Sequence, residues 1–264
     1  MSWLPEPSRD GACLVTGAGS GIGRAIASRL ARNGHNVVLI GRREERLRSL
    51  AGDLSSPAVR AEWIGCDLAD PDALGGLPEE VESRGLRVDV LVNSAGIGSH
   101  GPFTGLDPVR EVEQVRVACE AVVELCGAFV TRMAARRRGA VMIVSSGLGF
   151  QPVPRQATYA AGKAFAISFG EALHSELRRD RVAVSTVCPG PVETGFFAAN
   201  GPNPAQRLPP FMWQSADQVA VAAIDGLERN RRLVVPGMPV RALFSASRLA
   251  PTALRRRVIA HALR

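Results

Sequence analysis

The sequence predicts an α/β protein built on a doubly wound parallel β-sheet of about seven strands, with helices on both faces. Short apolar runs alternate along the chain with longer stretches of helical periodicity. Most of the apolar runs are continuous, which is typical of parallel strands buried on both faces. A glycine-rich turn joins the first run to the first helical stretch. Regular alternation of strand and helix indicates βαβ units, which we expect to form a single domain over residues 1–264.

The strands are expected where β-branched and other apolar residues gather. Their ranges are Ala12–Thr16, Val37–Ile40, Arg60–Ile64, Val88–Val92, Ala140–Val144, Val182–Val187 and Leu233–Val235. The helices are expected between them, over Ile22–Arg32, Glu44–Leu54, Pro71–Ser83, Pro108–Arg136, Thr158–Arg178 and Ala216–Arg229. In the first helix Ile22, Ile26 and Leu30 recur at four-residue steps, which places them on one apolar face.

Two segments interrupt this alternation. The stretch at about 189–212 is rich in Pro, Gly and Asn and is expected to form a long loop with short helices. Its large apolar residues, Phe196, Phe197, Phe211, Met212 and the adjoining Trp213, either line an apolar substrate site or pack against the body. The stretch at about 236–264 alternates arginines with apolar residues. This extension either lies on a membrane surface or covers the subunit or a neighbouring one.

Composition narrows the classes of protein that the chain can represent. Hydrophobic residues make up 46% and charged residues 22%, as in soluble globular proteins. No run approaches 18 apolar residues, so no transmembrane span is expected, and the start of the chain has no apolar leader. The formal charge is +7, but no aromatic residues interleave with the arginines, so we expect no nucleic-acid partner. A basic surface would instead favour anionic substrates, a nucleotide phosphate or an acidic carrier protein.

The metal-ligating residue types are scattered. The five cysteines form no Cys-x-x-Cys pair and most lie among apolar neighbours, which favours free thiols in a reducing cytosol and a cytoplasmic protein. The four histidines are isolated along the chain, so no metal site is expected. His100 could face a substrate but is interpreted as a surface histidine.

The glycine-rich turn indicates a site for a dinucleotide. Glycines at a turn between a strand and a helix let the backbone approach a pyrophosphate, and the helix N-terminus offers free N–H groups and a positive dipole end. The residues predicted to make these contacts are Gly17, Gly19, Ser20, Gly21, Ile22 and Gly23.

The end of the second strand indicates which dinucleotide binds. A carboxylate there would bind the ribose hydroxyls of NAD, but the sequence continues with Gly41, Arg42 and Arg43. Arginine accommodates a 2′-phosphate, so the predicted cofactor is NADP(H). The alternative is that Arg42 and Arg43 only open the next helix on its exposed side.

A tyrosine and a lysine stand out by their rarity. Tyr159 is the only tyrosine, and of the 32 residues counted as Lys or Arg only Lys163 is lysine. Four residues apart on a helix, the phenol and the ammonium project from one face. A nearby ammonium lowers the pKa of a phenol and makes it a better proton donor near neutral pH. The compact ammonium can also reach a sugar hydroxyl.

Together, the glycine-rich turn and Tyr159-x-x-x-Lys163 resemble the classical short-chain dehydrogenase/reductase family, whose fold is of the Rossmann type. The resemblance covers nearly the whole chain. It implies a catalytic set of Ser146, Tyr159 and Lys163, with Ser145 as the competing serine. It further implies that the cofactor contacts Asp67, Leu68, Asn93, Ala95, Gly96, Tyr159, Lys163, Pro189, Gly190, Val192 and Thr194. The segment at about 189–212 would then be the substrate lid, and a homo-oligomer, dimer or tetramer, is expected.

One position departs from the family pattern. Alignment to that pattern puts Ala118 where the family usually has an Asn that holds a water between the lysine and solvent. The methyl group of alanine forms no hydrogen bond, so proton resupply would need backbone carbonyls, waters or another route.

The expected function is hydride transfer between NADP(H) and a carbonyl or secondary-alcohol substrate, plausibly an apolar one. Tyr159 would protonate the carbonyl oxygen, Ser146 would hydrogen-bond the same oxygen, and Lys163 would bind the nicotinamide ribose. Two alternatives remain. One is an NADP-binding sensor or scaffold with little turnover, which Ala118 favours. The other is a reductase of 3-oxoacyl chains on an acidic carrier protein.

Overall fold

Seven parallel strands form the central sheet of the computed structural model, which describes residues 2–196, 208–238 and 241. Their order across the sheet is β3-β2-β1-β4-β5-β6-β9. The strands are β1 (Gly11–Thr16), β2 (Asn36–Gly41), β3 (Ala61–Gly65), β4 (Arg87–Asn93), β5 (Gly139–Val144), β6 (Val182–Val187) and β9 (Leu233–Val234). Every pair of neighbours is parallel, as the continuous apolar runs predicted.

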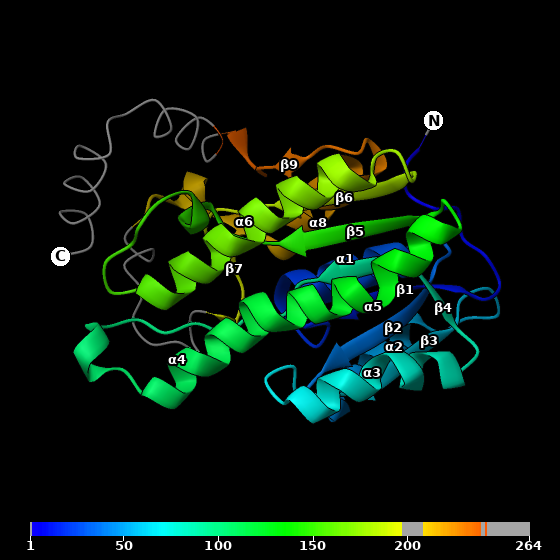
Figure 1. Cartoon of the computed structure of the whole chain (residues 1–264), viewed down its shortest axis with the longest axis horizontal. Helices are drawn as coiled ribbons and strands as arrows, with labels where there is room; N and C mark the ends of the chain where they lie inside the picture. Colours follow the sequence, from blue (N-terminus) through cyan, green and yellow to red (C-terminus); the bar gives the residue numbers. More distant parts are fainter. Residues whose placement is uncertain (1, 197–207, 239–240, 242–264) are drawn as a thin grey trace.

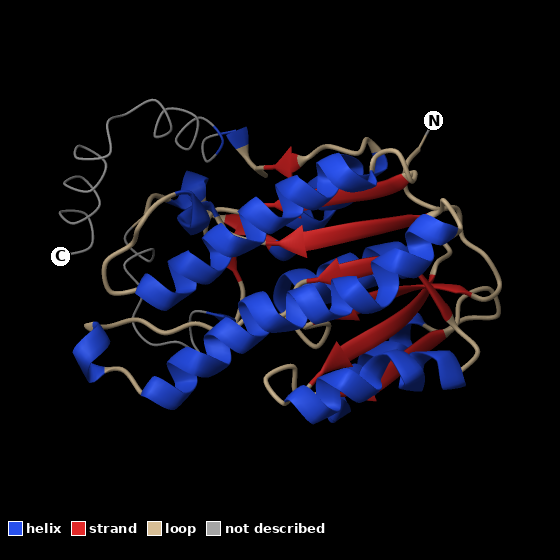
Figure 2. Cartoon of the chain, in the orientation of Figure 1, coloured by secondary structure: helices blue, strands red, loops and turns tan. Residues whose placement is uncertain are grey.

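The longer helices lie on both faces of this sheet (Figure 1). They are α1 (Gly21–Arg32), α2 (Glu44–Leu54), α3 (Pro71–Ser83), α4 (Pro108–Val115), α5 (Ala121–Ala135), α6 (Ala157–Leu177) and α8 (Ala216–Glu228). Side chains of α3, α5 and α6 share one hydrophobic core with the sheet, and those of α1, α2 and α8 share the other. In Figure 2, α3, α5 and α6 lie in front of the strands. The predicted doubly wound α/β fold is therefore confirmed.

The connection between β1 and its neighbours creates the crevice that holds the site. β1 pairs with β2 on one side and with β4 on the other, so the chain reverses its direction of winding at this point. In open α/β sheets, ligands bind outside the carboxyl ends of the strands where the strand order reverses. The glycine-rich turn after β1 and the loop after β4 meet there.

Local sequence explains where several helices begin. Asp70 accepts hydrogen bonds from the backbone N–H groups of Asp72 and Ala73, and Pro71 occupies the first helical position. Asp107 and Pro108 repeat this arrangement at α4. These caps place the starts of α3 and α4 where the sequence predicts them.

The predicted helix Pro108–Arg136 is not continuous. A π-helical turn, η2 (Arg116–Glu120), separates α4 from α5, and Ala118 lies within it. A π-turn widens the helix by one residue and shifts the face presented by the following residues. This turn packs closely against α6, since a Cβ atom on Gly162 would lie 2.9 Å from the Cβ atom of Ala118.

The predicted lid is anchored at both ends. A short parallel pair, β7 (Val192–Glu193) with β8 (Gln214–Ser215), was not predicted and ties the two ends together. Between them are the 3₁₀-helix η5 (Pro210–Met212) and residues 197–207, which lie outside the described residues. The predicted extension at 236–264 also lies outside them, except for 236–238 and 241. No helix in the described ranges is both long and apolar enough to cross a membrane.

A buried carboxylate holds the start of β4. Asp89, with 6% of its side chain exposed, pairs with Arg87 at 3.0 Å, with Arg136 at 3.2 Å and with Arg138 at 3.6 Å. Burial by itself raises the pKa of Asp89, but the hydrogen bond and charge of Arg87, with the charges of Arg136 and Arg138, outweigh it and hold the pKa below its ordinary value. The ion pairs join β4 to the end of α5.

Asp89→Asn should destabilise the fold near neutral pH, because three guanidinium groups lose their shared carboxylate. We expect a loss of about 3 kcal/mol in the free energy of unfolding at pH 7, as for breaking a buried ion pair. The folded-state pKa is depressed, so the carboxylate stabilises the fold above the unfolded-state pKa of about 3.9, and this contribution is lost as the pH falls through the folded-state value. Urea unfolding should be measured from pH 7 down to pH 3. The difference in the free energy of unfolding between wild type and variant should become smaller only in the acidic range.

The matched control is Asp10→Asn, which removes the exposed partner of Arg87. We expect this substitution to lower the free energy of unfolding by less than about 1 kcal/mol. If the difference in the free energy of unfolding between wild type and Asp89→Asn stays constant down to pH 3, the ionised Asp89 carboxylate does not stabilise the fold as assigned here.

Candidate active site

A pocket of about 640 Å³ opens at the carboxyl ends of the strands. It combines the turn after β1, the starts of α2 and α4, the loops after β3, β4 and β5, the first turns of α6 and the segment after β6. Every predicted catalytic and cofactor residue lines it except Asn93. Those that do are Gly17, Gly19, Ser20, Gly21, Ile22, Gly23, Arg42, Arg43, Asp67, Leu68, Ala95, Gly96, Ser146, Tyr159, Lys163, Pro189, Gly190, Val192 and Thr194.

The glycine-rich turn is shaped by close backbone contacts. Gly17 has a φ of +66°, and a Cβ atom there would lie 2.8 Å from the Cα atom of Ala95. A Cβ atom on Gly23 would lie 2.5 Å from the carbonyl oxygen of Gly17. The Thr16 side chain joins the end of β1 to the loop after β4, since its Oγ1 accepts hydrogen bonds from the N–H groups of Ser94 (2.9 Å) and Ala95 (3.0 Å). The turn therefore brings the start of α1 and the loop after β4 to one edge of the pocket.

Three arginines surround the end of the pocket below this turn. Arg43 donates a hydrogen bond to the Ser20 hydroxyl at 2.9 Å, and Arg42 lies 3.8 Å from the Asp67 carboxylate. Arg46, which was not predicted, also lines the pocket. Burial lowers the pKa of Arg43, and the charges of Arg46 and Arg42 act in the same direction. The helical spacing from Arg42 to Arg46 could have signalled this third cation. Repulsion among the three would be relieved by a bound dianion.

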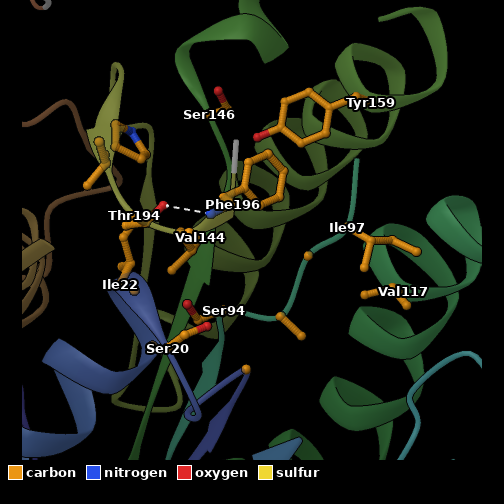
Figure 3. Close-up of a pocket in the computed structure, with 18 of the residues that line it drawn as sticks. Ser20, Ile22, Ser94, Ile97, Val117, Val144, Ser146, Tyr159, Thr194 and Phe196 are labelled. Atoms are coloured by element: carbon orange, nitrogen blue, oxygen red, sulfur yellow. Dashed lines mark hydrogen bonds between the residues drawn. The ribbon is translucent and has the colours of Figure 1, made fainter. Parts of the chain in front are cut away.

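The catalytic candidates meet at the opposite end. The Tyr159 phenol and the Ser146 hydroxyl are neighbours, and Figure 3 shows them side by side above the end of β5. Ser146 also accepts a hydrogen bond from the N–H group of Leu148 at 3.2 Å, which orients its side chain. The Tyr159 ring lies 5.6 Å from the Phe196 ring, measured between centroids. A carbonyl oxygen entering between these groups could be bonded by both hydroxyls.

Ser145, the competing serine, is occupied elsewhere. Its hydroxyl donates to the backbone oxygen of Lys163 at 2.7 Å, and only 3% of the residue is exposed. It therefore ties β5 to α6. This geometry favours Ser146 as the serine that reaches a substrate.

Lys163 lies deep beneath the phenol. Its ammonium donates a hydrogen bond to the backbone oxygen of Val144 at 2.9 Å and lies 5.7 Å from the centre of the Tyr159 ring. A Cβ atom on Gly96 would lie 3.6 Å from the Nζ atom, so the loop after β4 runs directly past the ammonium. The lysine is 7% exposed. It therefore presents a buried charge at the floor of the pocket.

Burial dominates the ionisation of both groups. It raises the pKa of Tyr159 to about 12, with the neighbouring Ser146 hydroxyl acting in the opposite direction. It lowers the pKa of Lys163 to about 8, although the thiols of Cys188 and Cys119 act the other way. The sequence predicted that the ammonium lowers the pKa of the phenol. The pKa of the phenol is nevertheless above its ordinary value, because burial favours the neutral form.

Asn93 was predicted to pass close to the cofactor through backbone contacts, and its side chain points away from the pocket. It is buried at 4% exposure, and its side-chain amide lies 3.6 Å from the sulfur of Cys126 on α5. The side chain thus points into the core behind the pocket, and Ser94 lines the pocket in its stead. His100 does not line the pocket either; burial lowers its pKa, and Arg155 adds to this effect.

The upper wall contains residues that the sequence did not single out. A Cβ atom on Gly21 would lie 3.1 Å from the Thr194 methyl group, so the segment after β6 closes over the glycine-rich turn. Further lining residues are Ile97, Arg110, Val117, Leu148, Gln151, Gln156, Phe196, Leu208 and Met212. Phe196 and Met212 were predicted as lid residues, whereas exposed helix residues such as Arg110 carry no sequence signal of a site. Among the described residues, no group of three His, Cys, Asp or Glu side chains could hold a metal ion.

Comparison with known proteins agrees with this geometry. Residues 12–205 match the model of the short chain dehydrogenase family. The chain belongs to this family. The predicted resemblance to the short-chain dehydrogenase/reductase family is therefore confirmed.

Three relatives illustrate the match. A short chain dehydrogenase of Pseudocercospora fijiensis is 37% identical over 189 residues, which cover 70% of this chain and 60% of that protein. A very-long-chain 3-oxoacyl-CoA reductase of Pyrenophora tritici-repentis is 34% identical over 206 residues, covering 73% of this chain and 60% of that protein. A solved short-chain dehydrogenase from Sphingobium yanoikuyae in complex with NADPH has a TM-score of 0.82 and 28% identity, with 95% of both chains covered. The match thus spans less than two thirds of each fungal relative.

The sole lysine makes its ionisation directly observable. In protein labelled with ¹⁵N-lysine, the single Nζ resonance should titrate near pH 8 in the protein without cofactor, because burial disfavours the ammonium. An exposed lysine titrates at its ordinary pKa of 10.5. Unfolding in urea supplies the control, since the same resonance should then titrate at the ordinary value. A midpoint near 10 in the folded protein would contradict the buried position of the ammonium.

Proposed function

We propose that this protein is an NADP(H)-dependent oxidoreductase that interconverts a carbonyl compound and the corresponding secondary alcohol. The observation that carries the proposal is the grouping of Tyr159, Ser146 and Lys163 at one end of a pocket whose other end holds three arginines. The first group suits proton transfer to a carbonyl oxygen, and the second suits a phosphorylated adenosine.

The residues present fit NADP(H). Gly17, Gly19, Ser20, Gly21, Ile22 and Gly23 would hold the pyrophosphate through backbone N–H groups at the start of α1. Arg42, Arg43 and Arg46 would pair with the 2′-phosphate. The adenine would lie against Asp67 and Leu68, and the nicotinamide beneath Pro189, Gly190, Val192 and Thr194. Ala95 and Gly96 would pass beneath the ribose groups. The NADPH complex of the Sphingobium yanoikuyae relative supports this choice of cofactor.

Tyr159 would act as the general acid. Its phenol is protonated at physiological pH, and burial raises its pKa further, so it holds a proton ready for a developing alkoxide. Ser146 would donate a hydrogen bond to the same oxygen and stabilise its negative charge. When bound, the nicotinamide cofactor supplies or accepts the hydride. In the reverse direction, Tyr159 would accept the proton from the alcohol.

Lys163 would bind the nicotinamide ribose and stabilise negative charge on the phenol. Its ammonium lies close enough to the Tyr159 ring for attraction to favour the phenolate that forms after proton donation. Resupply of the proton cannot use a side chain at position 118, because Ala118 offers no hydrogen-bonding group. It would use backbone groups and water near the π-turn.

Two alternatives have specific support. Ala118 favours a cofactor-binding sensor or scaffold with slow turnover. The very-long-chain 3-oxoacyl-CoA reductase among the relatives favours a reductase of 3-oxoacyl chains held on a carrier protein or on coenzyme A. Turnover of free ketones separates the proposed function from both.

We further propose a cytoplasmic homo-oligomer, with the described chain forming one domain and the segment at 189–212 serving as its substrate lid. Val109, Val112 and Val123 expose 67%, 52% and 45% of their surface along α4 and α5. Such apolar faces suit contact with another subunit. The five cysteines are free thiols, as expected in a reducing compartment.

Tyr159→Phe should lower kcat for ketone reduction by about 100-fold or more, since general acid catalysis contributes that much. The binding constant for NADPH should change less than about threefold, because the aromatic ring stays in place. Steady-state rates over a panel of ketones and aldehydes, together with NADPH fluorescence titration, measure both quantities. Full activity in Tyr159→Phe would exclude the proposed mechanism, and bound NADPH without turnover in the wild type would favour the sensor.

Arg42→Gln and Arg43→Gln should each weaken NADPH binding by about 10-fold while leaving NADH binding unchanged, because a charge-assisted bond to phosphate is lost. Fluorescence titration with both cofactors checks this. The control is Arg48→Gln on α2, whose guanidinium stacks over Trp63 outside the pocket. An equal loss of affinity for NADH and NADPH would mean that the arginines do not bind the 2′-phosphate.

A further inference from the structure

Gln156 is a buried polar residue of the pocket to which neither the cofactor nor the proton transfer gives a role. It occupies the N-cap position of α6, one helical turn before Tyr159, and both residues line the pocket. Side chains three residues apart on a helix are neighbours on one face. The Gln156 side chain is therefore placed next to the phenol.

The carboxamide of Gln156 makes no hydrogen bond within the described part of the chain. A polar side chain at an N-cap commonly accepts a hydrogen bond from the helix N-terminus, but Gln156 does not. The residue is only 8% exposed, yet its amide is not among the polar groups sealed inside the protein without a partner. The amide therefore faces the pocket. A ligand that completes its hydrogen bonds gains affinity, because a buried amide left unpaired is unfavourable.

The backbone holds this amide on a rigid base. The Gln156 N–H group donates a hydrogen bond to the Val153 oxygen at 3.2 Å, and the Gln156 oxygen accepts one from the Ala160 N–H group at 2.9 Å. The preceding residue, Arg155, has a left-handed φ of +67°, and its oxygen accepts a hydrogen bond from the Gly101 N–H group at 2.9 Å. Such a backbone conformation is unfavourable for a residue other than glycine and persists where the surroundings enforce it. The turn before α6 thus presents its amide to the pocket in one position.

The charged groups of the described pocket lining are placed elsewhere. Three arginines and Asp67 lie at the adenosine end, and Lys163 is buried at the floor. Arg110 donates a hydrogen bond of 3.5 Å to the Gly98 oxygen, and a Cβ atom on Gly98 would lie 3.4 Å from the Tyr159 ring. A carboxamide is neutral and offers one acceptor oxygen and two donor hydrogens. It therefore suits an uncharged carbonyl or hydroxyl oxygen on the ligand.

We propose that Gln156 is a specificity-determining residue that hydrogen-bonds a second, uncharged oxygen of the substrate, so that the substrate class is a ketone with a further carbonyl or hydroxyl group a few atoms from the reacting carbon. The inference rests on the proposed function, since it takes Tyr159 as the site of the reacting carbonyl. The short spacing follows from the single helical turn between the two side chains, roughly 5–6 Å between Cβ atoms. A ketone with a purely apolar chain would leave the amide unpaired.

The test compares ketones of equal length with and without the second oxygen. Ethyl 3-oxobutanoate is paired with heptan-2-one, ethyl 4-oxopentanoate with octan-2-one, and 4-hydroxybutan-2-one with pentan-2-one. Wild type and Gln156→Met are assayed with NADPH on every pair, because methionine keeps an unbranched side chain of similar length and removes the amide. The ester pairs and the hydroxyl pair show which kind of oxygen is bound.

We expect Gln156→Met to lower kcat/KM for the oxygenated member of at least one pair by about fivefold or more, since a hydrogen bond is lost. For the apolar member kcat/KM should stay equal or rise, because the variant no longer leaves an amide unpaired. The greater intrinsic reactivity of a 3-oxo ester does not affect the result, since each ketone is compared between the two proteins. The affinity for NADPH should be unchanged.

Gln151→Met is the matched comparison, because Gln151 also lines the pocket but is less buried. A loss of selectivity in Gln151→Met but not in Gln156→Met would overturn the inference, and so would equal effects on both members of every pair. A weaker affinity for NADPH in Gln156→Met would overturn it by assigning the amide to the cofactor. A lower melting temperature with unchanged selectivity would overturn it by assigning a structural role. Gln156→Leu replaces Gln156→Met in the comparison if that variant does not fold.

If no ketone of either kind is reduced, the proposed function fails for these compounds and the inference is decided by binding. Isothermal titration calorimetry then measures the affinity of each ketone for the protein saturated with NADPH. A preference for the oxygenated members that Gln156→Met removes would support the inference, and equal affinities within every pair would overturn it.

Discussion

The first turns of α6 approach their neighbours so closely that two facing positions leave no room for a side chain. A Cβ atom on Gly149 would lie 2.7 Å from the Lys163 carbonyl carbon, and one on Gly162 would lie 2.9 Å from the Ala118 methyl group. The Ser145 hydroxyl donates a hydrogen bond to the same Lys163 carbonyl group. This contact fixes α6 against the end of β5 and against the π-turn. The placement of the phenol, the ammonium and the Ser146 hydroxyl at one end of the pocket depends on it.

Burial, which follows from that close packing, controls the chemistry available to these groups. It favours the neutral phenol and the neutral amine alike, so the pKa of Tyr159 rises while that of Lys163 falls. A phenol held in its protonated form is suited to giving a proton to an alkoxide. An ammonium whose pKa lies near 8 responds strongly to any charge placed beside it. The arginines after β2 and Arg110 on α4, which also line the pocket, are instead exposed to solvent.

Much of the fold could be predicted because its signals are local. Continuous apolar runs mark buried strands, the pairs Asp70-Pro71 and Asp107-Pro108 mark helix starts, and glycines mark the turn after β1. The π-turn at Ala118 and the pairing of β7 with β8 escaped prediction, because each depends on a partner distant in the chain. The motif predicted that the backbone of Asn93 passes the cofactor, but it did not predict that the side chain points toward Cys126, which follows because alternate residues of a strand face opposite sides of the sheet.

The sequence by itself determined the fold class, the family and the candidate catalytic residues, because these are encoded in periodicity and in a few residues at set spacings. It could not determine the ionisation of Tyr159 and Lys163, since burial depends on how tightly α6 packs against β5. Nor could it place Arg110 beside the reacting end, because an exposed arginine on a helix looks like many others until the chain folds. Only the tertiary structure, which brings α4 and the Gly98 loop to the Tyr159 ring, decided which cations surround the pocket.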